Sequence, residues 1–130
     1  VHEGARRHPA GAVRFLGPVK SEDLPALYRG AAAVVHPALD EGFGMTVAEA
    51  MAVGAPTVAS RAGSLPEVAG EAALLVPPTD PDAWAEAILR VVHDSALAED
   101  LSARGRERAS GLTVEAMAAA TLKVYREAAP

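Results

Sequence analysis

Apolar residues along the chain alternate between short continuous runs and longer segments with helical spacing. Four short runs rich in Val, Leu and Ala, at residues 13–16, 32–36, 57–59 and 73–76, predict strands. The second run is uninterrupted until Pro37, which is typical of a strand buried on both faces. The periodicity of the longer segments predicts the helices that connect and follow these strands.

Helix boundaries are marked by capping and breaking residues. Ser21 is predicted to be the N-cap of a helix whose apolar face includes Leu24, Leu27 and Tyr28. A later helix has Asp80 as N-cap and Pro81 in its first position, and Trp84 belongs to its core-facing stripe rather than to a ligand site. Three other helices are predicted at 45–53, which Gly54 and Pro56 end, at 97–109 and at 113–128.

The order of these elements predicts the fold class. Strands that alternate with helices form βαβ units, so we expect an α/β fold with a mainly parallel sheet and flanking helices. A length of 130 residues fits one domain. Ligands bind such sheets at the carboxyl ends of the strands, so the loops after Leu16, His36, Ser60 and Val76 are the candidate site.

Composition and charge exclude several classes of function. A formal net charge of −5 without a basic patch argues against non-specific nucleic-acid binding. The chain has no cysteine, and His2, His8 and His93 lack ligand spacing, so neither disulfides nor a zinc site is expected. No apolar run approaches the ~20 residues that cross a bilayer. We therefore expect a cytoplasmic protein, or one at the cytosolic face of a membrane.

The segment after the strand that ends at His36 has the composition of an anion-binding turn. Gly42 and Gly44 permit close approach of the backbone to a ligand, and a helix begins directly after them. The first N–H groups of a helix have no intrahelical partner and lie at the positive end of its dipole. This turn is therefore a socket for phosphate or for several hydroxyls, to which Thr46 adds a side-chain hydroxyl.

Two carboxylates, Glu41 and Glu49, stand eight residues apart on either side of this turn. Acids beside an anion socket fit a ligand that is part phosphate and part polyol, because carboxylates accept hydrogen bonds from vicinal hydroxyls. A sugar nucleotide is such a molecule. One acid would hold the ribose and the other the transferred sugar.

The Glu41-to-Glu49 segment resembles the signature of the retaining GT-B glycosyltransferases of family 4, in which seven residues separate two glutamates. The resemblance covers nearly the whole chain from Val13 onward. Further stretches resemble the family in order and spacing, at 15–17, 24–28, 56–60, 63–68 and 74–76. The resemblance implies a Rossmann-like three-layer domain. Residues 1–130 would form one partial C-terminal donor-binding domain whose first strands are missing.

The implied activity is retaining transfer of a hexose from a nucleotide sugar, GDP-mannose or a UDP-sugar, to an acceptor. The family uses same-face attack assisted by the leaving diphosphate, without a cofactor or an essential metal. Glu41 would be the catalytic, positioning acid at the sugar, and Glu49 would hold the ribose. The other implied donor contacts are the amides of Gly42, Phe43, Gly44 and Met45, the Thr46 hydroxyl at a phosphate, and the turn Gly17, Pro18, Val19 at the base.

The chain also departs from the family pattern. Family members bring an arginine and a lysine to the diphosphate from an earlier segment, and Arg6, Arg7 and Lys20 do not match that context. The acceptor-binding N-terminal domain is missing, and Ala38 replaces a common serine. We therefore expect the isolated chain to bind donor weakly and to transfer little or no sugar.

The family's strand order, 3-2-1-4-5-6, places two missing strands beside the second strand of this chain. The first strand would then lack its native neighbour and leave an exposed edge. We expect either that Val13–Leu16 re-pairs beside Ala33–His36, or that another chain supplies the edge through self-association or strand exchange.

Each motif also has a purely structural interpretation. Thr46 and Glu49 fit a capping box, as do Ser64 and Glu67, for which the cap is the favoured interpretation. Glu41 could be a solvated loop acid, although its place before Gly42 favours function. His36 is expected to be satisfied locally rather than catalytic, and Phe43 to pack as a side chain. We also expect the side chains of three arginines in a late helix to lie on the solvated surface: Arg104, Arg106 and Arg108.

Four other functions compete with sugar transfer. A non-catalytic truncated module would keep the fold alone, and the intact glutamate segment argues against degeneration. A sugar-nucleotide epimerase needs further acid–base groups, and a phosphorylase needs a lysine that holds pyridoxal; no residue of the sequence is recognisable in either role. A nicotinamide dehydrogenase is disfavoured because Gly42-Phe43-Gly44 lacks the third glycine of the dinucleotide fingerprint.

Overall fold

The computed structural model describes residues 12–129, so that His2, His8, Arg6 and Arg7 lie outside the described residues. Three strands and six helices are present in this part of the chain. In chain order the elements are α1 (Leu24–Gly30), β1 (Val34–His36), α2 (Met45–Ala52), β2 (Thr57–Ser60), α3 (Leu65–Ala69), β3 (Leu74–Val76), α4 (Pro81–His93), α5 (Ser95–Ser110) and α6 (Val114–Ala128).

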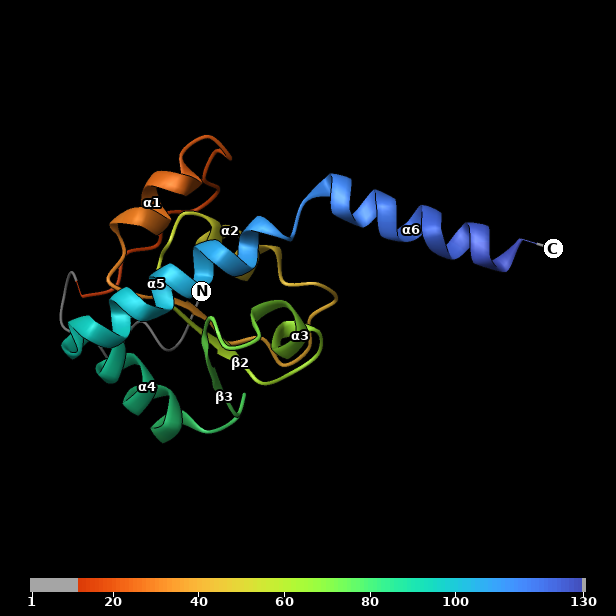
Figure 1. The fold of residues 1–130 in the computed structure, drawn as a ribbon. Coiled ribbons are helices and arrows are strands. Elements are labelled where there is room, and N and C mark those ends of the chain that lie inside the picture. The colour runs from red at the N-terminus through yellow and green to blue at the C-terminus, as the bar shows by residue number, and fades with distance from the viewer. Residues whose placement is uncertain (1–11, 130) are drawn as a thin grey trace.

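The strands form one parallel sheet in the order β1-β2-β3. Val35 of β1 lies opposite Val58 of β2, and Ala59 of β2 lies opposite Leu75 of β3. Parallel neighbours need crossover connections, and α2 and α3 supply them (Figure 1). The predicted α/β fold with a parallel sheet is confirmed.

Helices cover both faces of the sheet and make three layers. Ala59 packs with residues of α2 and α3 on one face, among them Val47, Met51 and Leu65, all fully buried. On the other face Val58 packs with residues of α4 and α5. These include Trp84, Ala87, Val91 and Leu101. Alternation of side chains along β2 therefore divides the core into two halves, and Trp84 is a core residue as predicted.

Two predicted helix boundaries depend on local chemistry and are confirmed. Asp80 accepts a hydrogen bond from the Ala83 amide at 3.0 Å through its side chain, and α4 begins with Pro81. The α2 helix ends at Ala52, one residue before the predicted end, and the Gly54 amide donates to the Met51 carbonyl beyond it. The first helix differs, because its N-cap is Asp23 rather than Ser21.

The prediction of a strand at Val13–Leu16 is wrong, and so is its re-pairing beside Ala33–His36. The described residues place 13–16 outside the sheet, in irregular backbone. Val13, Phe15 and Leu16 are 44%, 63% and 53% exposed. An extended apolar run becomes a strand only where a neighbouring strand pairs with it, and within residues 12–129 no strand pairs with this run.

The extent of helix α3 was not predicted, only a cap at Ser64, and the C-terminal end of this helix accounts for the contacts of a surface arginine. Arg108 of α5 donates from Nε to the Val68 carbonyl at 3.0 Å and from Nη2 to the Glu67 carbonyl at 2.6 Å. Carbonyls at a helix end lack intrahelical donors, so this guanidinium satisfies them. Arg108 is exposed, as expected of a surface residue, and in addition joins α5 to α3 through these two hydrogen bonds.

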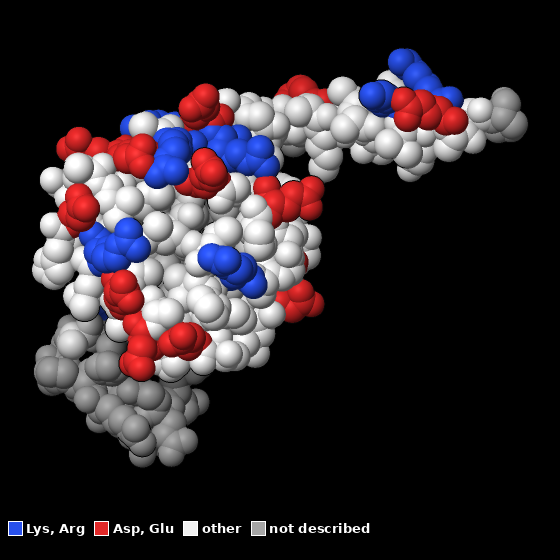
Figure 2. Space-filling model, turned by 60° about the horizontal axis from the view of Figure 1, so that its bottom comes forward, with Lys and Arg blue, Asp and Glu red and all other residues white. Residues whose placement is uncertain are grey.

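Helix α6 projects from the body of the molecule (Figure 1) and has no buried residue. Figure 2 shows α6 extending from the body of the molecule. On the visible face of the body, acidic and basic side chains are interspersed. Within residues 12–129, no helix combines the length and the hydropathy that a membrane crossing needs.

Candidate functional site

The Glu41 carboxylate lies over the carboxyl end of β1. The loop from Pro37 returns toward the strand, and Glu41 Oε2 lies 3.1 Å from Nε2 of His36, the last residue of β1. The two side chains are 33% and 20% exposed, so the pair is partly shielded from water but still reaches solvent. His36 is thus satisfied locally, as expected, and its partner is the acid with the proposed catalytic role.

The main chain of Glu41 is held by its own loop, through Asp40, and by the loop after β2, through Ser64. Its amide donates to Asp40 Oδ1 at 3.0 Å. Its carbonyl accepts from the Ser64 amide at 3.1 Å and from Ser64 Oγ at 3.0 Å. The capping-box interpretation of Ser64 and Glu67 is therefore wrong: Ser64 is the N-cap residue of α3, but its hydroxyl binds the Glu41 loop instead of a helix amide.

Close backbone packing at Gly63 joins these two loops. A Cβ atom there would lie 2.6 Å from the Glu41 carbonyl oxygen and 2.7 Å from its amide nitrogen. Gly63 also has φ +53°, which side-chain-bearing residues rarely adopt. The loop after β2 therefore holds the loop after β1 at a distance that only glycine permits.

The N-terminus of α2 begins directly after the Glu41 loop. Gly44 is its N-cap with φ 94°, and the first helical amides to donate, those of Val47 and Ala48, both bond the Gly44 carbonyl. The amides of Met45 and Thr46 precede these bonds and have no intrahelical acceptor. The capping-box interpretation of Thr46 is wrong, because Thr46 is the second residue of the helix and not its N-cap.

Glu49 lies on α2 and faces α1. The Tyr28 hydroxyl donates to Glu49 Oε2 at 3.4 Å. Both residues line a largely apolar cleft of about 260 Å³, together with Ser21, Leu24, Pro25, Ala52 and Val53. The predicted base-side turn at residues 17–19 does not line this cleft, although Ser21, two residues further on, does.

Tyr28 titrates abnormally because of this environment. Desolvation raises the pKa of its hydroxyl above the usual 10.0, and the charge of Glu49 and the hydrogen bond to it raise the pKa further, while a hydrogen bond with Thr46 lowers it.

A group whose pKa is raised on folding adds to the free energy of unfolding, and this contribution is fully present at pH values below the pKa of the group in the unfolded chain. This contribution is lost as pH rises through the folded pKa. We therefore expect the free energy of unfolding to fall above about pH 10 more steeply in the parent than in Tyr28→Phe. Urea denaturation across this pH range measures the difference, and parallel curves would contradict the assignment.

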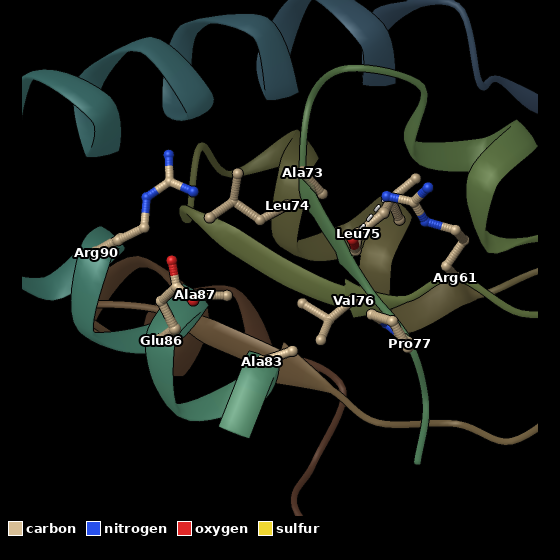
Figure 3. A pocket seen from close by; sticks show the side chains of 10 residues that line it. All are labelled: Arg61, Ala73, Leu74, Leu75, Val76, Pro77, Ala83, Glu86, Ala87 and Arg90. Carbon is tan, nitrogen blue, oxygen red and sulfur yellow. Dashed lines mark hydrogen bonds between the residues drawn. The ribbon is translucent and has the colours of Figure 1, made fainter. Parts of the chain in front are cut away.

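A second hollow, of about 400 Å³, lies between β3, α4 and Arg61 (Figure 3). Leu74, Val76 and Ala87 line it, Glu86 and Arg90 lie at its α4 side, and Arg61 Nη2 donates to the Leu75 carbonyl at 3.2 Å. Its lining residues include none from the segment between Glu41 and Glu49. The hollow therefore lies apart from the Glu41-to-Glu49 segment, although Arg61 and Pro77 in its lining belong to the candidate loops after Ser60 and Val76.

The structure thus brings Glu41, Gly44 and the first amides of α2 together, and places Glu49 one turn further along the same helix. Sequence reasoning missed the contacts of His36, Tyr28 and Ser64 with the two acids. A partial signal existed, because each lies beside a loop at the carboxyl edge of the sheet or on the helix packed against α2.

Comparison with known proteins now decides the family. The family model described as glycosyl transferases group 1 matches residues 5–108. The chain belongs to this family. The resemblance drawn from the Glu41-to-Glu49 segment is confirmed.

Relatives in group 1 are much longer than this chain. It is 40% identical over 126 residues to the O-antigen chain mannosyltransferase B of Escherichia coli, covering 97% of the chain and 32% of that protein. It is 42% identical over 118 residues to the D-inositol 3-phosphate glycosyltransferase of Nocardioides sp., covering 89% and 26%. The chain therefore spans about a third or less of the curated relatives that it matches.

Solved structures of group 1 proteins and their relatives have the same fold. Sucrose-phosphate synthase from Thermosynechococcus elongatus matches with a TM-score of 0.78 and 40% identity, over 88% of this chain and 29% of that one. The C-terminal domain of a glycosyl transferase group 1 family protein from Francisella tularensis matches with a TM-score of 0.66 and 30% identity, over 74% and 51%. The chain thus corresponds to the C-terminal domain of the family.

Proposed function

We propose that this chain is the donor-binding domain of a retaining hexosyltransferase, with Glu41 at the transferred sugar and Glu49 at the ribose. The observation that carries the proposal is the position of Glu41 beside the N-terminus of α2. A Cβ atom added to Gly44, the N-cap of this helix, would lie 3.7 Å from Glu41 Cγ. A carboxylate and free helix amides thus lie within the span of one sugar diphosphate.

The two kinds of group have complementary tasks. The amides of Met45 and Thr46 and the positive end of the helix dipole stabilise the charge that grows on the leaving diphosphate. A Cβ at Gly42 would meet no atom within 4 Å, so there is room for a ligand beside this backbone, whose Gly42 and Phe43 amides are proposed donors to the sugar and diphosphate. Glu41 accepts hydrogen bonds from sugar hydroxyls and stabilises positive charge at the anomeric carbon.

In the proposed reaction the bond between the anomeric carbon and the diphosphate oxygen breaks. The acceptor hydroxyl oxygen forms its bond on the same face, and its proton passes to the leaving diphosphate. Glu41 therefore acts as a positioning and electrostatic group and forms no covalent bond. The names of the relatives, a mannosyltransferase and an inositol-phosphate glycosyltransferase, support a hexose as the transferred group. GDP-mannose and UDP-sugars are accordingly the donors to test.

The two glutamates are distinguished by which ligand their loss weakens. Glu49→Ala is expected to weaken GDP and GDP-mannose, or UDP and UDP-glucose, by about tenfold alike. Glu41→Ala is expected to weaken only the sugar-bearing ligand by a similar factor. NMR titration of the chain measures the affinities, because it detects the weak binding expected of an isolated domain.

Glu99→Ala, at an exposed position of α5, is the matched control and should bind every ligand like the parent. Equal affinities of the Glu41→Ala, Glu49→Ala and parent chains for all four ligands would end the proposed assignment of roles.

A further inference from the structure

We propose that His36 is a positioning residue for Glu41, holding one carboxylate oxygen so that the other faces the donor sugar. The proposal rests on the proposed role of Glu41 as the sugar-binding acid. It begins from the 3.1 Å separation between His36 Nε2 and Glu41 Oε2.

The chemistry of this contact fixes the tautomer of the imidazole. An ionised carboxylate can only accept hydrogen bonds, so the proton of the contact belongs to His36 Nε2. Oε2 is thereby occupied by an internal donor. The lone pairs of Oε1 are left for hydroxyl groups of a ligand, which gives the carboxylate a defined orientation.

The backbone of His36 is held rigidly, which suits a residue that positions another side chain. It is the last residue of β1 and lies opposite Ala59 in the parallel ladder. Its carbonyl accepts a hydrogen bond from Ser60 Oγ at 3.4 Å. The imidazole therefore projects from backbone that both the sheet and a buried serine hold, whereas Glu41 belongs to a loop.

The other fixed contacts of Glu41 do not orient its carboxylate. Within residues 12–129, the hydrogen bonds with Asp40 and Ser64 hold the main chain of Glu41, and the bond with His36 is the one that reaches its carboxylate. A glutamate side chain has three rotatable bonds, and ordering them at the moment of binding costs affinity. His36 removes part of this cost before the ligand arrives.

Substitution of His36 separates a positioning role from a structural one. His36→Gln keeps an N–H donor near the position of Nε2, and His36→Leu removes it at similar volume. We expect His36→Leu to weaken GDP-mannose or UDP-glucose by about fivefold and to leave GDP and UDP unchanged. His36→Gln should restore most of this loss. An unchanged affinity of His36→Leu for the sugar-bearing ligands, or equal losses in the two variants, would overturn the proposal.

The Glu41→Ala variant distinguishes failure of this proposal from failure of the proposed function. If Glu41→Ala selectively weakens the nucleotide sugar and His36→Leu does not, only the role of His36 is wrong. If Glu41→Ala changes nothing, the sugar-binding role of Glu41 is wrong as well.

A spectroscopic measurement tests the contact without any ligand. Nitrogen NMR of the imidazole rings should show His36 as the Nε2–H tautomer in the parent chain, with a shift of the Nε2 resonance in Glu41→Ala. His93, exposed on α4, serves as the internal control and should not respond. An Nδ1–H tautomer at His36, or an Nε2 resonance that ignores the loss of Glu41, would refute the positioning role.

Discussion

Gly63→Ala is expected to lower the free energy of unfolding by about 3 kcal/mol. The new methyl group would lie 2.6 Å from the Glu41 carbonyl oxygen, and backbone atoms cannot yield as a flexible side chain can. The left-handed conformation at φ +53° adds its own cost for alanine. Because the two loops must separate to relieve the contact, Glu41 should also move and the sugar-bearing ligand should bind more weakly.

Gly30→Ala is the matched control for this substitution. Gly30 ends α1, has no positive φ, and a Cβ there would meet nothing within 4 Å. Its replacement should leave stability unchanged or raise it by about 0.5 kcal/mol. Urea denaturation of the three proteins makes the comparison. Equal stability of Gly63→Ala and the parent would show that the loops do not approach each other as described.

Leu101→Ala is expected to destabilise the protein by a comparable amount, about 3 kcal/mol. Leu101 of α5 is 1% exposed and packs against Val58, Val76 and Trp84 in the half of the core beneath α4 and α5. Removal of its isobutyl group leaves a cavity among residues from the sheet and two helices. These elements cannot collapse together without moving the strands.

Leu122→Ala provides the comparison at an exposed site with the same change of side chain. Leu122 is 48% exposed on α6, and its loss should change stability by less than about 0.5 kcal/mol. Thermal or urea unfolding measures both variants. Similar losses of stability in the two would contradict the division of the chain into a packed body and an unpacked α6.

Local chemistry explains which parts of the fold could be predicted. Asp80 and Pro81 start a helix because a carboxylate cap and a fixed φ act within one turn. The run at 57–59 was recognisable because a central parallel strand is apolar on both faces, and all four residues of β2 are buried. Signals of this kind involve residues a few positions apart, so the sequence itself contains them.

The errors arose where structure depends on distant partners. Val13–Leu16 has the composition of a strand, but no strand among residues 12–129 pairs with it, and composition alone cannot supply a pairing strand. Ser64 stands before α3 with the pattern of a cap, but the Glu41 carbonyl, 23 residues earlier, accepts its hydroxyl instead. Competition between a local and a long-range acceptor is decided only by the packed fold.

In the candidate site, too, the local features were predicted and the long-range contacts were not. The glycine-bracketed turn and the helix beginning at Met45 were predicted from residues between 37 and 52, and the structure places them as expected. The partners of the two acids were not predicted, because His36 and Tyr28 each look like ordinary strand-end and helix residues. Which side chain meets a carboxylate depends on how the loop turns and how α1 packs on α2.

The exposure of α6 has a consequence for its own persistence. A helix of 15 residues without a buried side chain gains nothing from the tertiary core, so only its capping bond at Thr113, its alanine-rich interior and the Lys123–Glu127 ion pair favour it. Such a segment melts gradually, residue by residue, and independently of the cooperative transition of the body. Backbone amides in α6 are consequently open to solvent deuterium on the timescale of helix fraying, whatever the stability of the sheet.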